Sequence, residues 1–174
     1  MNSSKTWLWL EDAPTTVSDI AQLLSMNDIK TKKISNPSDL IIFLLNERGK
    51  GLENYGLLID VMIQGAHFIS SPQAWNGGAD AIYRTETGYD AGIVFVEEIV
   101  LNKNGNWKPI WKNPLPPIIF ITTLTESDEQ AQRILNIKQA WAENMKVTES
   151  ESKIAWWRKW DLNTDKYIKL MKTW

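Results

Sequence analysis

Short, unbroken runs of apolar residues recur along the chain, and most of them end on a charged or hydroxyl-bearing residue. Residues 7–10, 56–59, 117–121 and 154–158 are such runs, and 29–34 is a weaker one. Apolar runs of four to six residues bounded by turn-forming or charged residues are typical of buried strands. The pattern therefore predicts five strands with both faces covered.

Between these runs the apolar positions follow helical spacing and are preceded by helix-start signals. Helices are predicted from 16–19 onward, from 36 through 45, over 91–101, over 125–145 and over 163–171. The run 40–45 is apolar enough for a strand, but Asn36 as N-cap and Pro37 at the first helical position favour a helix. For 91–101 the spacing permits either element, and the order of the neighbouring strands favours a crossover helix. Alternating strands and helices predict an α/β fold, a doubly wound five-stranded parallel sheet.

Two segments interrupt this pattern, one after the third strand and one before the fourth. Residues 64–89 are rich in Gly, Ser and Pro and are predicted to form an irregular insertion. Residues 102–116 contain Asn104-Gly105, which predicts a small β-hairpin. Trp75, Trp107 and Trp111 lie in these insertions, and we favour packing onto the body over an exposed interface. We expect the extra residues to elaborate the active-site side of the domain.

Composition narrows the class of protein. A chain of 174 residues suits one domain with extra segments, and a net charge of −2 gives no field that would gather nucleic acid or an anionic membrane. The absence of cysteine excludes disulfides, thiolate zinc sites and cysteine nucleophiles. The longest apolar run, 40–45, is too short to span a bilayer, and the N-terminus lacks the pattern of a secretory signal. We expect a soluble intracellular protein that binds neither nucleic acid nor membrane.

Polar residues at the strand ends carry the candidate chemistry. Glu11 and Asp12 follow the first strand, Asp60 closes the third, Thr122 follows the fourth and Lys159 the fifth. The carboxyl ends of parallel strands meet at one edge, so we expect these side chains in one crevice. Three carboxylates there repel one another unless a cation neutralises them, and Mg²⁺ prefers such oxygens. With that charge balanced, Asp60 can attack a phosphoryl group.

These strand ends resemble the receiver domain of two-component response regulators. The matching segments are 10–14 (LEDAP), 57–65 (LLIDVMIQG), 117–123 (PIIFITT) and 157–162 (WRKWDL). The resemblance covers most of the chain outside the two insertions. It implies a single domain over 1–174 with a flavodoxin-like sheet of strand order 2-1-3-4-5.

The resemblance also implies roles for individual residues. Glu11 and Asp12 correspond to the acidic pair that binds Mg²⁺, and Asp60 to the phosphoacceptor, itself a metal ligand. Met62 corresponds to the position whose backbone carbonyl binds the metal. Further roles fall on Thr122, which senses the phosphoryl group, on Lys159, which pairs with it, and on Trp156, the aromatic switch.

The function implied is that of a phosphorylation-dependent receiver in a phosphorelay. Its phosphodonor is a sensor histidine kinase or a phosphotransfer protein, and its output passes to a downstream protein partner. Any enzymatic activity is Mg²⁺-dependent self-phosphorylation and autodephosphorylation at Asp60. A cytoplasmic location is expected, a homodimer is left open, and no output domain is expected after the last helix.

The chain also departs from the family pattern. Gln64 and Trp160 stand where the family usually has proline, and Gly92, the residue expected to open the third helix, lies 32 positions after Asp60. The insertion 64–89 therefore starts beside the acceptor, as a lid, a docking surface or an obstruction. These departures keep open a receiver-like interaction module that no longer switches by phosphorylation.

A haloacid-dehalogenase-like phosphohydrolase is a weaker interpretation of the aspartate that closes the third strand. The motif of that family has a second aspartate two residues after the nucleophile, and in this chain Met62 stands at that position. Thr123 is a second candidate for the active hydroxyl. Trp156 and Trp157 must point to opposite faces of a strand, so one of them is expected in the core. His67 is the single histidine, and a metal-binding role for it is not favoured.

Overall fold

The central sheet has five parallel strands. The computed structural model describes residues 5–13, 18–71, 81–105, 109–111, 114–125, 128–161 and 163–174. The strands are β1 (Thr6–Leu10), β2 (Thr31–Ile34), β3 (Tyr55–Asp60), β6 (Ile118–Thr122) and β7 (Ile154–Arg158), in the order β2-β1-β3-β6-β7. Without the intervening hairpin this is the order 2-1-3-4-5. The predicted α/β fold with a doubly wound, receiver-like sheet is confirmed.

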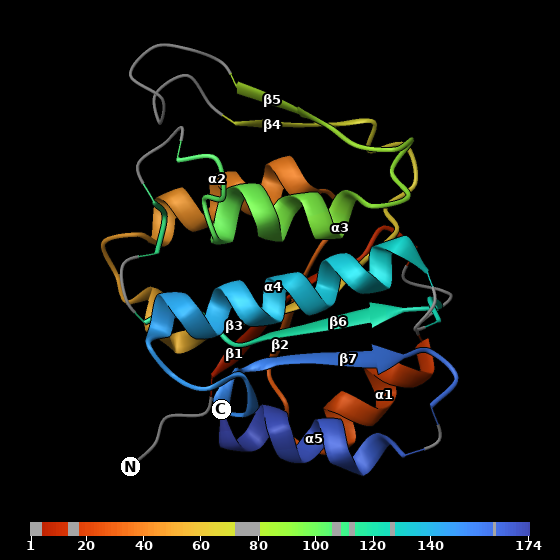
Figure 1. The fold of residues 1–174 in the computed structure, drawn as a ribbon. Helices are drawn as coiled ribbons and strands as arrows, with labels where there is room; N and C mark the ends of the chain where they lie inside the picture. The colour runs from red at the N-terminus through yellow and green to blue at the C-terminus, as the bar shows by residue number, and fades with distance from the viewer. Residues whose placement is uncertain are drawn as a thin grey trace.

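Helices cover both faces of the sheet (Figure 1). One face packs against α1 (Ser18–Met26) and α5 (Thr164–Thr173), and the other against α2 (Pro37–Glu47), α3 (Ala91–Val94) and α4 (Glu129–Met145). A π-helix, η3 (Phe95–Val100), continues α3, and two short 3₁₀ turns are η1 (Leu52–Asn54) and η4 (Glu149–Glu151). Among the described residues, no helix is long and apolar enough to cross a membrane.

Side-chain alternation along the strands builds two cores. In β1, Leu8 and Leu10 join the core under α2, α3 and α4, whereas Trp7 and Trp9 join the core under α1 and α5. In β7, Trp157 is buried and stacks on Tyr167 of α5, with ring centroids 4.8 Å apart. Trp156 is half-buried against the other core, so the prediction of opposite faces with one core tryptophan is confirmed.

Sequence signals predicted the start of one helix correctly and the start of another wrongly. The Asn36 side chain accepts a hydrogen bond from the Asp39 N–H at 2.8 Å, which confirms the helix predicted from residue 36. The start predicted at Thr125 is wrong, because α4 begins at Glu129. There the Asp128 carboxylate accepts hydrogen bonds from the N–H and hydroxyl of Thr125, which forms a turn before the helix.

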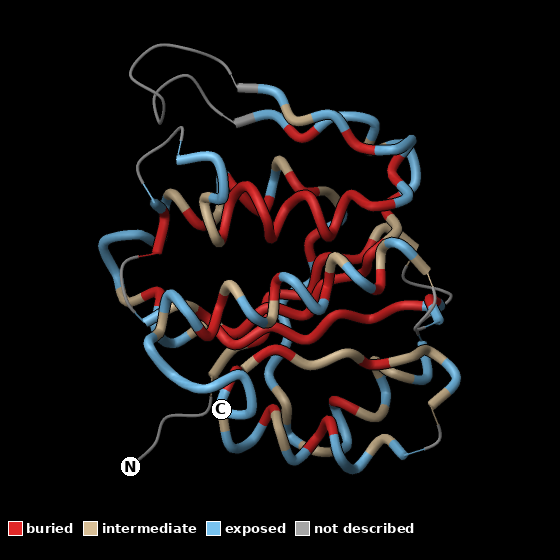
Figure 2. The backbone as a smooth tube through the Cα atoms, in the orientation of Figure 1, coloured by how far each residue is buried: buried red, intermediate tan, exposed pale blue. Residues whose placement is uncertain are grey.

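The segment predicted to be irregular, 64–89, contains an antiparallel hairpin, β4 (Phe68–Ser71) and β5 (Ala81–Arg84). The hairpin lies over α2 and α3 (Figure 1), with Ile69 fully buried and the Ser70 hydroxyl 3.3 Å from that of Ser38. Every residue of α3 and η3 is consequently buried (Figure 2). Residues 72–80, including Trp75, lie outside the described residues.

The insertion is closed at its base beside the end of β3. The Ile63 N–H donates to the Gly88 carbonyl at 2.9 Å, and the Thr85 N–H to the His67 carbonyl at 3.0 Å. From this base the hairpin runs back over α2 rather than across the strand ends. The expectation that the extra residues elaborate the active-site side therefore needs correction, since the hairpin serves to cover helices.

The second insertion, 102–116, packs on the core through Trp111, which is 4% exposed, as the packing interpretation predicted. The Arg48 guanidinium donates to the Pro109 carbonyl at 3.1 Å and ties this segment to the end of α2. The described parts of the segment, 102–105, 109–111 and 114–116, include no strand, and Trp107 lies outside them. The hairpin predicted there therefore stays a prediction.

Gly92 holds α3 against the end of β3. Its N–H donates to the Val61 carbonyl at 3.1 Å, and a Cβ added to it would lie 2.0 Å from the Asp60 carbonyl oxygen. Gly92→Ala is therefore expected to lower the free energy of unfolding by roughly 1–3 kcal/mol, as overpacking does. Urea unfolding measures this. The matched control is Gly49→Ala, because no atom of the described residues lies within 4 Å of a Cβ there. Equal stability of the two variants would contradict the argument.

Candidate functional site

Three carboxylates meet at the carboxyl-terminal edge of the sheet. Glu11 and Asp12 directly follow β1, and Asp60 is the last residue of the neighbouring strand β3. One ligand oxygen from each of the three lies within 4.8 Å of the others. Parallel pairing of β1 with β3 thus brings together residues nearly fifty positions apart.

Two of these carboxylates are buried, since Glu11 and Asp60 are each 3% exposed. Burial, and then the charge of Asp60, raises the pKa of Glu11 to about 7. Burial also raises the pKa of Asp60, against the opposing pull of Lys159. One Glu11 oxygen accepts from the Ala13 N–H at 2.9 Å, whereas the other, Oε2, is buried and has no hydrogen-bond partner among the described residues. Within the part of the chain that the structure describes, the site is therefore short of positive charge and of hydrogen-bond donors.

Lys159 supplies the positive charge present. Its Nζ lies 2.7 Å from Asp60 Oδ2 and 3.9 Å from Glu11 Oε2. Its backbone N–H donates to the Thr122 carbonyl at 2.9 Å, which fixes the loop after β7 against the end of β6. The predicted lysine, which follows β7, thus contacts the predicted acceptor at the end of β3, although β6 lies between these two strands in the sheet.

Thr122 lies at the next strand end, one position beyond Ile121, the residue paired with Asp60. Its side chain is 1% exposed, and its hydroxyl oxygen accepts from the Leu124 N–H at 2.9 Å. Thr123, the alternative hydroxyl, is exposed. The hydroxyl of Thr122 is thus held within its own loop by a hydrogen bond to Leu124.

Backbone N–H groups after β3 complete the site. The Met62 N–H donates to Asp60 Oδ1 at 3.3 Å, and the Gln64 N–H donates to Asp12 Oδ2 at 2.6 Å. Proline has no N–H, so the second bond depends on Gln64 standing where the family pattern has proline. Reasoning from the sequence treated Gln64 only as a departure and missed this role. The only signal in the sequence was an N–H gained shortly after Asp60, at a position where proline would have none.

Trp156 lies outside the carboxylate cluster, near the end of β7. The Arg158 guanidinium lies over the Trp156 ring, 5.4 Å from the ring centroid. The Trp156 backbone carbonyl accepts a hydrogen bond from the Tyr167 hydroxyl at 2.8 Å. The Trp156 indole nitrogen is buried, and no residue that the structure describes forms a hydrogen bond with it. Trp160, which follows Lys159, is 54% exposed.

The donor set fits a hard divalent cation. Carboxylate oxygens are the ligands that Mg²⁺ prefers, and the unpartnered Glu11 Oε2 is a buried oxygen that a cation would satisfy. Glu11, Asp12 and Asp60 are the residues that could hold it.

The raised pKa of Glu11 predicts how stability depends on pH in the absence of metal. Between the usual pKa of 4.5 and the folded value of about 7, the folded protein binds more protons than the unfolded chain. The free energy of unfolding should therefore fall as pH rises through this range. Urea unfolding in EDTA at several pH values tests this, and Glu11→Gln should flatten the fall. Stability that rises over this range in both proteins would contradict the assignment.

Comparisons with known proteins bear on the fold of the chain and not on its function. No protein-family model and no curated protein matches the chain. Among solved structures, the BeF₃-activated receiver domain of Klebsiella pneumoniae RstA matches with 15% identity and a TM-score of 0.46, over 95% of each chain. A fusion carrying the yeast Spc42 trimeric coiled coil matches with 13% identity and a TM-score of 0.50, over 98% of this chain and 76% of that one. At such identities a likeness concerns the fold alone.

Proposed function

We propose that this chain is a phosphorylation-dependent signalling receiver whose phosphoacceptor is Asp60 and whose metal is Mg²⁺. The observation that carries the proposal is the cluster itself. A buried aspartate ends the central strand, two further carboxylates lie within 4.8 Å, and a lysine Nζ lies 2.7 Å away. Acidic residues and one cation around a buried carboxylate suit transfer of a phosphoryl group.

In the proposed transfer, an Asp60 oxygen attacks phosphorus and forms a P–O bond. The P–N bond of a phosphohistidine donor breaks, and the imidazole leaves with the electron pair and takes up a proton. Bound Mg²⁺ would neutralise charge on the phosphoryl oxygens. Lys159 exchanges its contact with Asp60 for a phosphoryl oxygen, and the Thr122 hydroxyl leaves the Leu124 N–H to donate to another.

The proposed output is a change in the surface near Trp156. Release of the Leu124 N–H would alter the loop that leads into α4, and movement of Lys159 would alter the end of β7. A phosphate group adds charge and strong acceptors, which is sufficient to bias such a two-state surface. A sensor histidine kinase or phosphotransfer protein is proposed as donor, and a protein that binds this surface as the downstream partner.

The second candidate is a receiver-like interaction module that no longer switches. It is favoured by the burial of Asp60, 3% exposed beneath Lys159, and by the exposed Trp160 in place of proline. Such a module would hold its partner equally well as wild type and as Asp60→Asn. A phosphohydrolase gains no support, because Met62 stands where that family has a second aspartate, and its N–H donates to Asp60 Oδ1.

Mass spectrometry of the intact protein separates these candidates. Wild type incubated with Mg²⁺ and acetyl phosphate is expected to gain the mass of one phosphoryl group, and Asp60→Asn or addition of EDTA should abolish the adduct. Asp28→Asn is the matched control, because Asp28 lies in the turn after α1, away from the site, and this variant should react as wild type does. Mg²⁺ binding without any adduct would reject the receiver and leave the non-switching module.

A further inference from the structure

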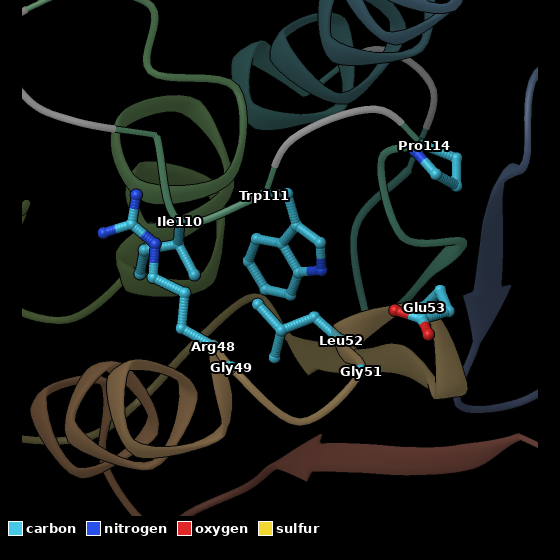
Figure 3. Close-up of a pocket in the computed structure, with 8 residues that line it drawn as sticks. All are labelled: Arg48, Gly49, Gly51, Leu52, Glu53, Ile110, Trp111 and Pro114. Atoms are coloured by element: carbon cyan, nitrogen blue, oxygen red, sulfur yellow. The ribbon is translucent and has the colours of Figure 1, made fainter.

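A pocket of about 430 Å³ lies at the edge of the sheet opposite the carboxylates (Figure 3). It is formed by the end of α2, the turn before β3, and Ile110, Trp111 and Pro114. Leu52 and Glu53 precede β3, whereas Asp60 ends it, so roughly 16 Å of strand separates the two sites. No residue of the pocket takes part in the chemistry proposed for Asp60.

The walls of the pocket are fixed by core packing. Leu52, Ile110 and Trp111 are 7%, 2% and 4% exposed and belong to the core under α2 and α4. The hydrogen bond from Arg48 to the Pro109 carbonyl holds the 109–111 segment beside the end of α2. The volume falls in the range of sites that bind small molecules, so a ligand would meet a largely preformed shape.

The lining combines an apolar surface with two opposite charges. Figure 3 shows the Trp111 ring between Arg48 on one side and Glu53 on the other, with Leu52 beneath it. A guanidinium keeps further N–H groups after donating one to Pro109, and these suit a carboxylate. The Trp111 indole nitrogen is buried, has no hydrogen-bond partner within the described residues, and faces the Glu53 side in Figure 3.

We infer that this pocket binds a small zwitterion with an apolar body, of about the size of a dipeptide. Its carboxylate pairs with Arg48, its ammonium pairs with Glu53, and its apolar side chains lie along Trp111 and Leu52. A dianion would be repelled by Glu53, and an uncharged apolar molecule would form no ion pair with Arg48 or Glu53. The inference does not depend on phosphorylation of Asp60.

The test uses the dipeptide leucyl-leucine and the Trp111 indole N–H signal in a ¹H–¹⁵N NMR spectrum, assigned by comparison with Trp111→Phe. The Trp111 signal is expected to shift and to saturate at low millimolar peptide. Blocking the peptide as N-acetyl-leucyl-leucine amide should weaken binding at least about tenfold, because both charge-assisted contacts are lost.

Variants of the two charged residues provide the controls. Arg48→Gln and Glu53→Gln should each weaken leucyl-leucine about tenfold. Arg84→Gln, an exposed arginine on the hairpin, should leave binding unchanged. No saturable shift, equal binding of the blocked peptide, or equal binding by Arg48→Gln would each overturn the inference. None of these results bears on the Asp60 adduct, so the two proposals fail separately.

Discussion

Arg133→Met is expected to lower the free energy of unfolding by about 3–5 kcal/mol, the usual loss when one partner of a buried ion pair is removed. Arg133 on α4 donates to Asp90 Oδ2 at 2.5 Å and to Glu97 Oε2 at 2.6 Å. Both acceptors are buried, at 4% and 7% exposed. These two carboxylates raise the pKa of Arg133 against the opposing effect of its burial, so the guanidinium stays charged in the fold.

This network matters because it joins α4 to the elements beside Asp60. Asp90 also accepts from the Glu86 N–H at 2.7 Å, and two residues later Gly92 packs on the Asp60 carbonyl. Urea unfolding measures the loss, and Arg84→Met on the exposed hairpin face is the control, expected within about 0.5 kcal/mol of wild type. A loss below about 1 kcal/mol for Arg133→Met would mean that the carboxylates find other partners.

Lys159→Met is expected to have the second largest effect, with opposite consequences for stability and metal binding. Without metal, Asp60 loses the ammonium 2.7 Å away, and the free energy of unfolding should fall by about 3 kcal/mol. Binding of Mg²⁺ should strengthen by about tenfold or more, because Lys159 competes with the metal for the same carboxylates. Added Mg²⁺ should therefore restore most of the lost stability.

Calorimetric titration and urea unfolding, each with and without Mg²⁺, check both parts. Lys169→Met on the exposed side of α5 is the matched control and should behave as wild type does. Weaker Mg²⁺ binding by Lys159→Met than by wild type would show that the lysine does not compete with the cation, and the arrangement of charges at the site would need revision.

The sheet and the carboxylate cluster follow from features that are local in sequence. Each strand is an apolar run with its own stop signal, and the parallel order places the residues after those stops at one edge. The sequence alone therefore predicts that four residues lie close together, namely Glu11, Asp12, Asp60 and Lys159. The Asn36 cap could be predicted for the same reason, because a helix N-terminus needs an acceptor within three residues.

What the sequence did not predict depends on contacts between distant segments. The strands of the β4–β5 hairpin are short and are stabilised by packing on α2. The sequence of 64–89 contains no signal that predicts this packing. The burial of every residue in 91–100, a mostly apolar segment, is explained only once that hairpin covers α3 and η3. Arg133 meets Asp90 across 43 positions, and the donor role of Gln64 toward Asp12 needed the loop geometry.

The most direct test of the central claim is a crystal structure of the wild-type chain soaked with Mg²⁺ and beryllium fluoride. Beryllium fluoride mimics a phosphoryl group bound to a carboxylate. The account predicts beryllium fluoride density with the beryllium atom bonded to an Asp60 oxygen, a cation held by Glu11, Asp12 and Asp60, and Lys159 Nζ moved from Asp60 to a fluorine atom. An occupied cation site with no beryllium fluoride on Asp60, or a cluster that stays closed by Lys159 under these conditions, would contradict it.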